Sequence, residues 1–278
     1  MGRQKKMEET KTKPISEKGP AKIVNIVMIS QSGRYRIGSE SRPDIKHDSG
    51  FLDKFSHEEP TIGDRVQLQA WRAKLELAES LRPDLADATA AYKHFLDGKG
   101  SERSLNYERY IKNDESGKTT LASIIDDFKY HAGIIGEDRE YFELTSDSYA
   151  AGRGSLFPYP KTENWQKAIG AHILWVSAKI HCHIDSVDMK NSFSADVTIH
   201  MEDRYNFNPG AQDIATGIPD SANGRFEVTG LAMQYMNYGV IHRHVEWKEG
   251  NGSAATVSGE SQSRQRRPSD NRRLRNKI

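Results

Sequence analysis

The densest run of chemically versatile side chains lies in residues 202–226. Its side chains include the carboxylates of Asp203 and Asp213, the phenol of Tyr205 and the guanidinium of Arg225. Together such groups can accept a proton, hold a divalent ion through oxygen atoms and clamp a phosphate. We therefore predict these four as candidate catalytic residues. The alternative is that Asn-Pro-Gly and Asn-Gly turns, with capping carboxylates, only tie down a long loop.

Histidines form a second candidate site, for a transition metal. His181 and His183 are two residues apart in a predicted strand, so they face the same side, and His200 lies on the next predicted strand. Neighbouring strands could bring these imidazoles together around zinc or iron. No acidic companion stands at a characteristic spacing, so the alternative is a set of unconnected histidines on the polar face of a sheet.

A third motif, residues 116–120, resembles the end of a phosphate-binding P-loop. A P-loop requires glycine where this chain has Lys112, and an apolar strand before the loop where residues 111–115 are polar. The sequence therefore excludes nucleotide hydrolysis at this place. It favours a turn followed by a helix with Thr119 or Thr120 as its N-cap.

The composition of the chain limits the kinds of protein that could carry these candidate sites. The 278 residues are 36% hydrophobic and carry 40 Lys and Arg against 39 Asp and Glu. The single cysteine, Cys182, excludes an intramolecular disulfide. The Arg-rich C-terminal segment lacks interleaved aromatic residues, so we predict no specific nucleic-acid binding. No apolar run is long enough for a membrane span and no Sec signal is visible. We expect synthesis in the cytoplasm and, if the protein is exported, a non-Sec route.

Hydrophobic periodicity predicts the elements that position these residues. Helical spacing covers 61–81, 83–98, 119–133 and 163–169, and a further short helix is predicted at 229–235. Alternating or continuous apolar residues predict strands at 23–29, 141–144, 180–185, 193–202 and 240–247, with the third and fourth paired as an antiparallel hairpin. We therefore predict an α+β fold, with a helical N-terminal half and a C-terminal antiparallel β-sheet or half-barrel carrying short helices.

The same pattern divides the chain into four parts. Residues 1–22 and 248–278 are predicted to be disordered basic tails, because they cannot bury enough apolar surface to offset the entropy of ordering. Between them we predict a mainly helical region at 23–136 and an α+β effector domain at 137–247.

The order of segments 165–172, 203–210, 224–227 and 230–232 resembles an uncharacterised bacterial family often encoded near type VI secretion or Rhs toxin loci. More distantly, the block is similar to colicin M-type toxins, which share an Asp-x-Tyr-Asp-Phe stretch and cleave lipid II with help from a divalent metal. That similarity implies an acid at Asp203 and a tyrosine partner at Tyr205. The chain departs from the motif at Asn206, where those toxins have a second aspartate, and at Asp213, which with Gln212 replaces their His-Arg pair.

The resemblance implies an antibacterial effector that hydrolyses an envelope precursor, acting as a phosphodiesterase-like hydrolase with a divalent metal as possible cofactor. An immunity protein would then be a partner. Because an amide cannot replace a carboxylate base, a non-catalytic adaptor or structural component that binds a secretion-machine component is the alternative. Metal-dependent hydrolysis at the histidines is a third hypothesis.

Overall fold

The computed structural model describes residues 16–17, 34–54, 58–136, 139–212, 219–250 and 255–259, and it has the predicted α+β architecture. The helices are α1 (Ile62–Leu81), α2 (Ala86–Leu96), α3 (Tyr107–Asn113), α4 (Glu115–Ile135), α5 (Glu163–Ala168) and α6 (Ser221–Val228), with 3₁₀ turns η1 (Gly50–Lys54) and η2 (Pro83–Leu85). The strands are β1 (Ser16–Glu17), β2 (Tyr35–Ile37), β3 (Arg103–Ser104), β4 (Tyr141–Ser146), β5 (Tyr149–Ala151), β6 (His172–Ile184), β7 (Asn191–Tyr205), β8 (Ala211–Gln212), β9 (Tyr235–Lys248) and β10 (Ala255–Ser258).

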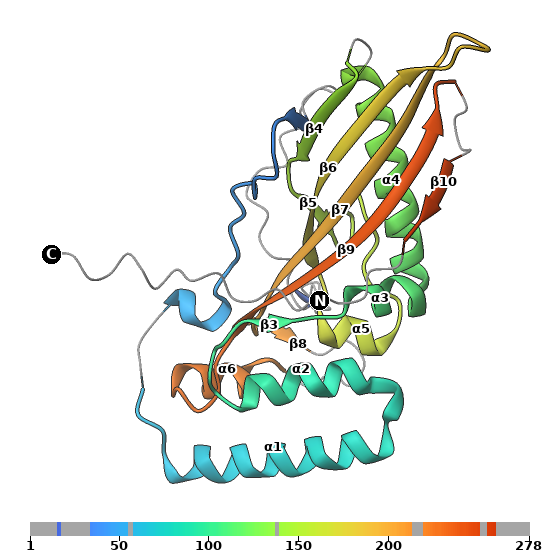
Figure 1. The fold of residues 1–278 in the computed structure, drawn as a ribbon. Helices are drawn as coiled ribbons and strands as arrows, with labels where there is room; N and C mark the ends of the chain where they lie inside the picture. Colours follow the sequence, from blue (N-terminus) through green and yellow to red (C-terminus); the bar gives the residue numbers. More distant parts are fainter. Residues whose placement is uncertain are drawn as a thin grey trace, which may run out of the picture.

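One long sheet dominates the molecule (Figure 1). Its strand order is β10-β9-β7-β6-β4-β2, with β3 beside β9 and β5 beside β6. All of these pairs are antiparallel except β3 with β9, which is parallel. The three longest strands, β6, β7 and β9, form its centre and run nearly the length of the molecule.

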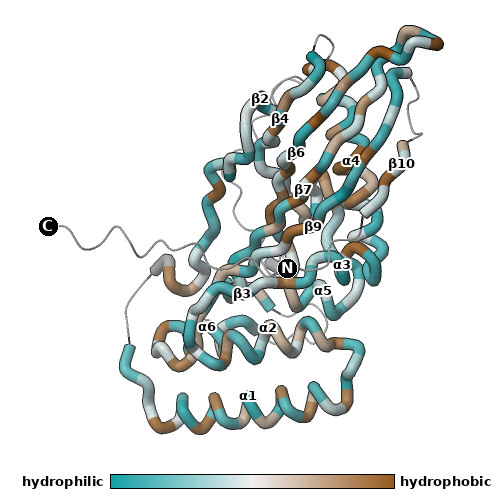
Figure 2. The backbone as a smooth tube through the Cα atoms, in the orientation of Figure 1, coloured by the Kyte–Doolittle hydropathy of each residue, from teal (hydrophilic) through white to brown (hydrophobic). Residues whose placement is uncertain are grey.

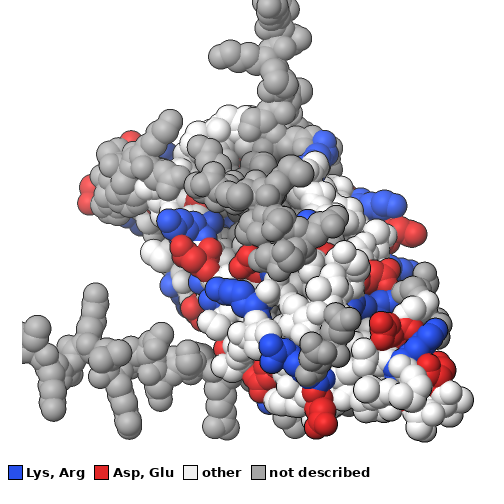
Figure 3. Space-filling view, turned by 90° about the horizontal axis from the view of Figure 1, so that it is seen from above, with Lys and Arg blue, Asp and Glu red and all other residues white. Residues whose placement is uncertain are grey.

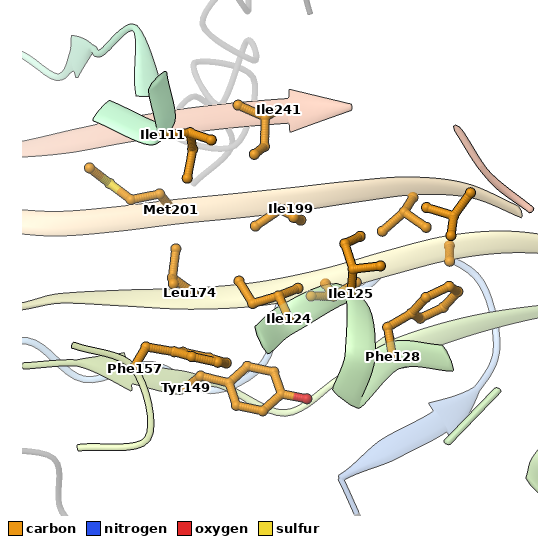
Figure 4. Close-up of a cluster of buried hydrophobic side chains, with 14 of the residues drawn as sticks. Ile111, Ile124, Ile125, Phe128, Tyr149, Phe157, Leu174, Ile199, Met201 and Ile241 are labelled. Carbon is orange, nitrogen blue, oxygen red and sulfur yellow. The ribbon is translucent and has the colours of Figure 1, made fainter. Parts of the chain in front are cut away.

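Alternation along the strands gives the sheet an apolar inner face and a polar outer face. The helix α4 covers the inner face, where Ile124, Ile125 and Phe128 meet Leu174 and Ile199 from the strands (Figure 4). Within this apolar layer lies one buried ion pair. Arg243 on β9 donates two hydrogen bonds, of 2.9 and 2.7 Å, to the carboxylate of Glu108 on α3.

A second apolar core lies at the end of the sheet where β7 stops and β9 starts. Helices α1, α2 and α6 close this end with Leu68, Leu75, Phe95 and Phe226, which pack with Tyr205 and Tyr235 of the strands. Both cores combine residues from before and after position 136. The boundary predicted between 23–136 and 137–247 stays a prediction, and the two regions share both apolar clusters.

The short helix predicted at 229–235 is wrong, and a glycine explains why. The helix α6 precedes this segment, and Gly230, at a φ of 67°, terminates it. The N–H groups of Gly230 and Leu231 donate to the carbonyls of Glu227 and Phe226, which is the Schellman arrangement at a helix C-terminus. Tyr235, placed in the predicted helix, instead begins β9.

The N-cap predicted at Thr119 or Thr120 is also wrong, because α4 starts at Glu115 and its N-cap lies five residues before Thr119. Asp114 is the N-cap, and its carboxylate accepts a 2.9 Å hydrogen bond from the Ser116 N–H. Gly117 therefore lies inside the helix. A Cβ at this position would lie 2.5 Å from the Tyr110 carbonyl oxygen, so the glycine permits close contact between α3 and α4.

The predicted tails are partly structured, since β1 pairs with β8 and β10 pairs with β9. The strand predicted at 23–29 lies outside the described residues. No helix in the described ranges is both long and apolar enough to cross a membrane.

Candidate functional site

Asp203 belongs to a row of polar side chains that crosses three strands of the sheet. In the strand register, Asn237 of β9 pairs with Asp203 of β7 on one side and with Arg103 of β3 on the other. The Asn237 amide donates to the Asp203 carboxylate at 3.1 Å, and its oxygen accepts from the Arg103 guanidinium at 3.2 Å. Asp203 and Asn237 are buried. The row separates the two apolar cores, since Met201 belongs to one core and Tyr205 to the other.

Tyr205 lies on the same face as Asp203, two residues further along β7, so the structure brings these two predicted residues together. Its ring stacks on Tyr235, with ring centroids 5.1 Å apart and an angle of 13° between the rings. Burial raises the pKa of Tyr205 well above its ordinary value, and the neighbouring tyrosines and Asp203 raise it further. The phenol therefore stays protonated at neutral pH and can act as a hydrogen-bond donor but not as a base.

His172, which the sequence analysis did not single out, extends this polar layer onto β6. It lies one position beyond the Ile173–Glu202 pair, the last in the register between β6 and β7. Its Nε2 is 2.8 Å from the Tyr107 hydroxyl and its Nδ1 is 3.0 Å from the Gly170 carbonyl oxygen. Burial lowers the pKa of His172 to about 4, so the ring is neutral at physiological pH.

Arg225 is not part of this row. It lies on α6, where its guanidinium forms a bidentate pair with Asp64 of α1 at 3.0 and 2.8 Å and a further ion pair with Glu58. These contacts tie α6 to the start of α1, where Asp64 also forms a capping box with Thr61. The Arg225 guanidinium, which we predicted to bind a phosphate, is thus already paired with two carboxylates. Asp213 falls in 213–218, outside the described residues.

Glu227 is a titratable group that sequence reasoning missed. It is buried on α6, and neither carboxylate oxygen accepts a hydrogen bond of normal geometry from the described residues. Burial raises its pKa to about 8, with additional contributions from the charges of Asp220 and Asp48 and an opposing one from the nearby Phe207 N–H. Glu227 therefore carries a proton at neutral pH. A helical glutamate is ordinarily exposed, so nothing in the local sequence indicates this state.

The three predicted metal-binding histidines all lie on the outer face of the sheet but do not converge. His200 pairs in register with Trp175 and stacks on its indole, with ring centroids 3.6 Å apart. His181 is six residues further along β6 than Trp175, about 20 Å at the usual strand rise, and contacts Tyr141. Among the described residues, no group of three His, Cys, Asp or Glu side chains is arranged to hold a metal ion.

The residues around Asp203 also do not suit the divalent metal that the toxin resemblance implies. Its carboxylate accepts a hydrogen bond from an amide and shares a row with the Arg103 cation, which disfavours a second positive charge. We therefore derive no catalytic step through a metal at this position.

An ion cluster around the buried Glu202 carboxylate lies on the outer face of the sheet, against residues 40–47. Arg42 and His47 both contact the Glu202 carboxylate, at 2.6 and 3.1 Å. Burial alone would raise the pKa of Glu202, but the bonds from His47 and Arg42 outweigh it and leave the pKa below its ordinary value. Residues Ile45, Ile173 and Trp175 form a small apolar cluster beside it. The cluster therefore holds this segment against the sheet.

At the opposite end of the sheet, the hairpin joining β6 and β7 exposes apolar side chains. Val187 is 90% exposed and Met189 74% exposed, and Ile184 is exposed at the end of β6. Lys248 of β9 binds the carboxylates of Asp185 and Asp188 in the turn, at 2.7 and 2.9 Å.

An open hollow of about 510 Å³ lies beside this hairpin. It is lined by His183, Ser194, Glu246, Trp247 and Thr256, among others. Figure 3 views the molecule from above and shows Lys and Arg side chains interleaved with Asp and Glu on its described surface. This end of the molecule therefore offers a mixed polar surface around exposed apolar side chains.

The chain was compared with protein-family models, with curated proteins and with solved structures, and no match was found. The functional assignment therefore rests on the residues themselves. They form a buried polar row from Arg103 through Asn237 to Asp203 with Tyr205 beside it, a protonated acid at Glu227, and an exposed hairpin with apolar side chains.

Proposed function

We propose that this chain is a non-catalytic adaptor or structural component, and that it binds a partner protein through the β6–β7 hairpin. The observation that carries the proposal is the apolar surface of that hairpin, where Val187 and Met189 are largely exposed on a turn bound by Lys248. Exposed apolar groups on a rigid scaffold are typical of protein-binding sites.

The predicted catalytic residues support the same proposal, because each of those described has an internal role. Asp203 bonds Asn237, Tyr205 stacks on Tyr235, and Arg225 pairs with Asp64. The resemblance noted in the sequence supplies the class of partner, a component of a secretion machine.

The test is affinity copurification of the full chain with the product of each neighbouring gene. We expect Val187→Asp and Met189→Asp to lose the partner, because each places a charge in an apolar contact. Leu156→Asp is the matched control, since Leu156 is exposed on another loop. Retention of the partner by both hairpin variants would refute the proposal, as would equal loss with the control.

A second candidate function is an antibacterial effector that hydrolyses an envelope precursor. The observation that favours it is the close grouping of Asp203, Tyr205 and Arg103 on one face of the sheet, which includes an acid, a hydroxyl and a cation. In this alternative Asp203 is the principal acid and Tyr205 orients it, while Arg225 would have to leave Asp64 and Glu58 to reach a phosphate.

The two functions separate in a toxicity assay. The chain is expressed in the cytosol and, with an export signal, in the periplasm of a sensitive bacterium, with and without the product of the neighbouring reading frame. An effector arrests growth, Asp203→Asn abolishes the arrest in a protein that remains folded, and an immunity protein relieves it. An adaptor arrests growth in neither compartment, and its Asp203→Asn variant still binds the partner.

A further inference from the structure

The helix α1 has two apolar sides, of which the fold uses one. Leu68 and Leu75 are buried in the second core, and Trp71 packs against it. On the other side, Ile62 is 83% exposed, Val66 64%, Leu77 59% and Leu81 67%. Figures 1 and 2 show α1 at the edge of the molecule, with hydrophobic residues recurring along its length.

The exposed residues form one continuous stripe. Ile62, Val66, Ala70, Ala73, Leu77 and Leu81 are spaced by three or four residues and are all exposed. At about 100° of rotation per residue they fall within an arc of about 100°, and no charged residue of α1 falls within that arc. We name these six residues the α1 stripe. A stripe of this spacing is the pattern by which one helix packs on another.

The order of large and small side chains along the α1 stripe is the same in both directions. Ile62 and Leu81 are equally far from the middle of the stripe, as are Val66 and Leu77, and so are the two alanines. If a second α1 is laid antiparallel across the first, each large side chain therefore meets a large one. The alanines meet at the centre, where small side chains allow two helices to approach closely. A surface with this symmetry is complementary to a copy of itself about a two-fold axis.

The flanking charges fit the same arrangement. Arg65 and Glu76 lie on one flank of the stripe, and neither forms an ion pair with any described residue of its own chain. In the antiparallel pair, Arg65 of one copy and Glu76 of the other lie within two residues of the same level, about 3 Å along the axis. The two-fold axis makes this contact twice.

We propose that α1 forms an antiparallel, two-fold symmetric homodimer through the α1 stripe. The partner that binds the α1 stripe is a second copy of this chain, because the stripe is complementary to itself in both side-chain size and charge. This surface lies at the opposite end of the molecule from the β6–β7 hairpin, so the dimer leaves the proposed partner-binding site open.

Sedimentation of the full chain over a range of concentrations tests the dimer. We expect a monomer–dimer equilibrium with a dissociation constant in the micromolar range, since six side chains per copy make a small interface. Val66→Glu and Leu77→Glu should each raise that constant more than tenfold. They should leave the circular dichroism spectrum unchanged, because both positions are exposed. The control Val187→Glu, exposed on the hairpin, should still dimerise. A monomer at all concentrations, or dimers unaffected by the two stripe variants, would overturn the proposal.

Charge reversal tests the partner and its direction. Arg65→Glu and Glu76→Arg should each weaken the dimer several-fold, and the double variant should restore it, because it exchanges the two ends of the same pair. Failure of the double variant to recover would contradict the antiparallel pairing.

Cysteine cross-linking gives an independent readout of orientation. An equimolar mixture of the Val66→Cys and Leu77→Cys chains should form a mixed disulfide on mild oxidation, because these two positions lie at the same level in the antiparallel pair. Each variant alone should not, because its two copies lie eleven residues, about 16 Å, apart along the helix axis. The native Cys182 is buried and should not compete. Efficient cross-linking of Val66→Cys to itself would show a parallel pair and overturn the proposal.

Discussion

Replacing Glu227 with glutamine should change how stability depends on pH. The unfolded chain ionises Glu227 near its ordinary pKa of 4.5, whereas the folded chain holds the proton until about pH 8. At about 1.36 kcal/mol for each pH unit, this interval corresponds to about 5 kcal/mol of lost folding free energy on the alkaline side. The loss is large because the carboxylate is buried beside Asp48 and Asp220 and accepts no hydrogen bond of normal geometry from described residues.

The direction follows from counting protons. Between pH 4.5 and 8 the unfolded chain binds fewer protons at residue 227 than the folded chain, so the wild-type protein loses stability as pH rises through this window. Below pH 4.5 Glu227 is protonated in both states, so it does not change how the free energy of unfolding depends on pH. The variant Glu227→Gln cannot ionise, so it should lack this part of the pH dependence altogether.

The assay is urea unfolding of both proteins at pH 4 and at pH 8.5. Any structural cost of the glutamine lowers the free energy of unfolding equally at both pH values. The difference in unfolding free energy between Glu227→Gln and wild type therefore changes with pH only through the ionisation of Glu227. We expect Glu227→Gln to gain about 5 kcal/mol relative to wild type on going from pH 4 to pH 8.5. Glu140→Gln, at an exposed glutamate, is the matched control and should show little change. A difference between Glu227→Gln and wild type that does not vary with pH would refute the reasoning.

Three further predictions concern the packing of the fold. Gly117→Ala should lower the free energy of unfolding by about 1 to 3 kcal/mol, because its Cβ would lie 2.5 Å from a backbone oxygen. In the same helix, Gly133→Ala meets no atom within 4 Å and should raise it by about 0.5 to 1 kcal/mol, and thermal unfolding distinguishes the two signs. Arg243→Met should cost about 3 to 5 kcal/mol in urea unfolding by leaving the Glu108 carboxylate buried without its partner, and an unchanged midpoint would contradict this account. Because burial lowers the pKa of His172 to about 4, stability should fall as pH drops from 6.5 to 4, and His172→Gln should flatten this acid limb in acid-denaturation curves.

Local pattern determined much of the architecture. The helical spacing between 61 and 98 and the alternation in 193–202 correspond to α1, α2 and β7, because a helix and a strand repeat their core-facing positions with different periods. The predicted strand ended at residue 202, whereas β7 continues to Tyr205 and so includes Asp203. The errors arose where a single contact decides the end of an element, as Gly230 does for α6 and Asp114 for α4.

Tertiary structure alone decided what the polar residues do. The pairing of Arg225 with Asp64 joins positions far apart in the chain, and the row from Arg103 through Asn237 to Asp203 exists only in the register of three strands. The proton on Glu227 depends on the low dielectric around it and on charges from other segments. Residue type and spacing indicate which side chains could take part in chemistry. Burial and partners, which the folded chain alone supplies, determine their charge and whether they are occupied.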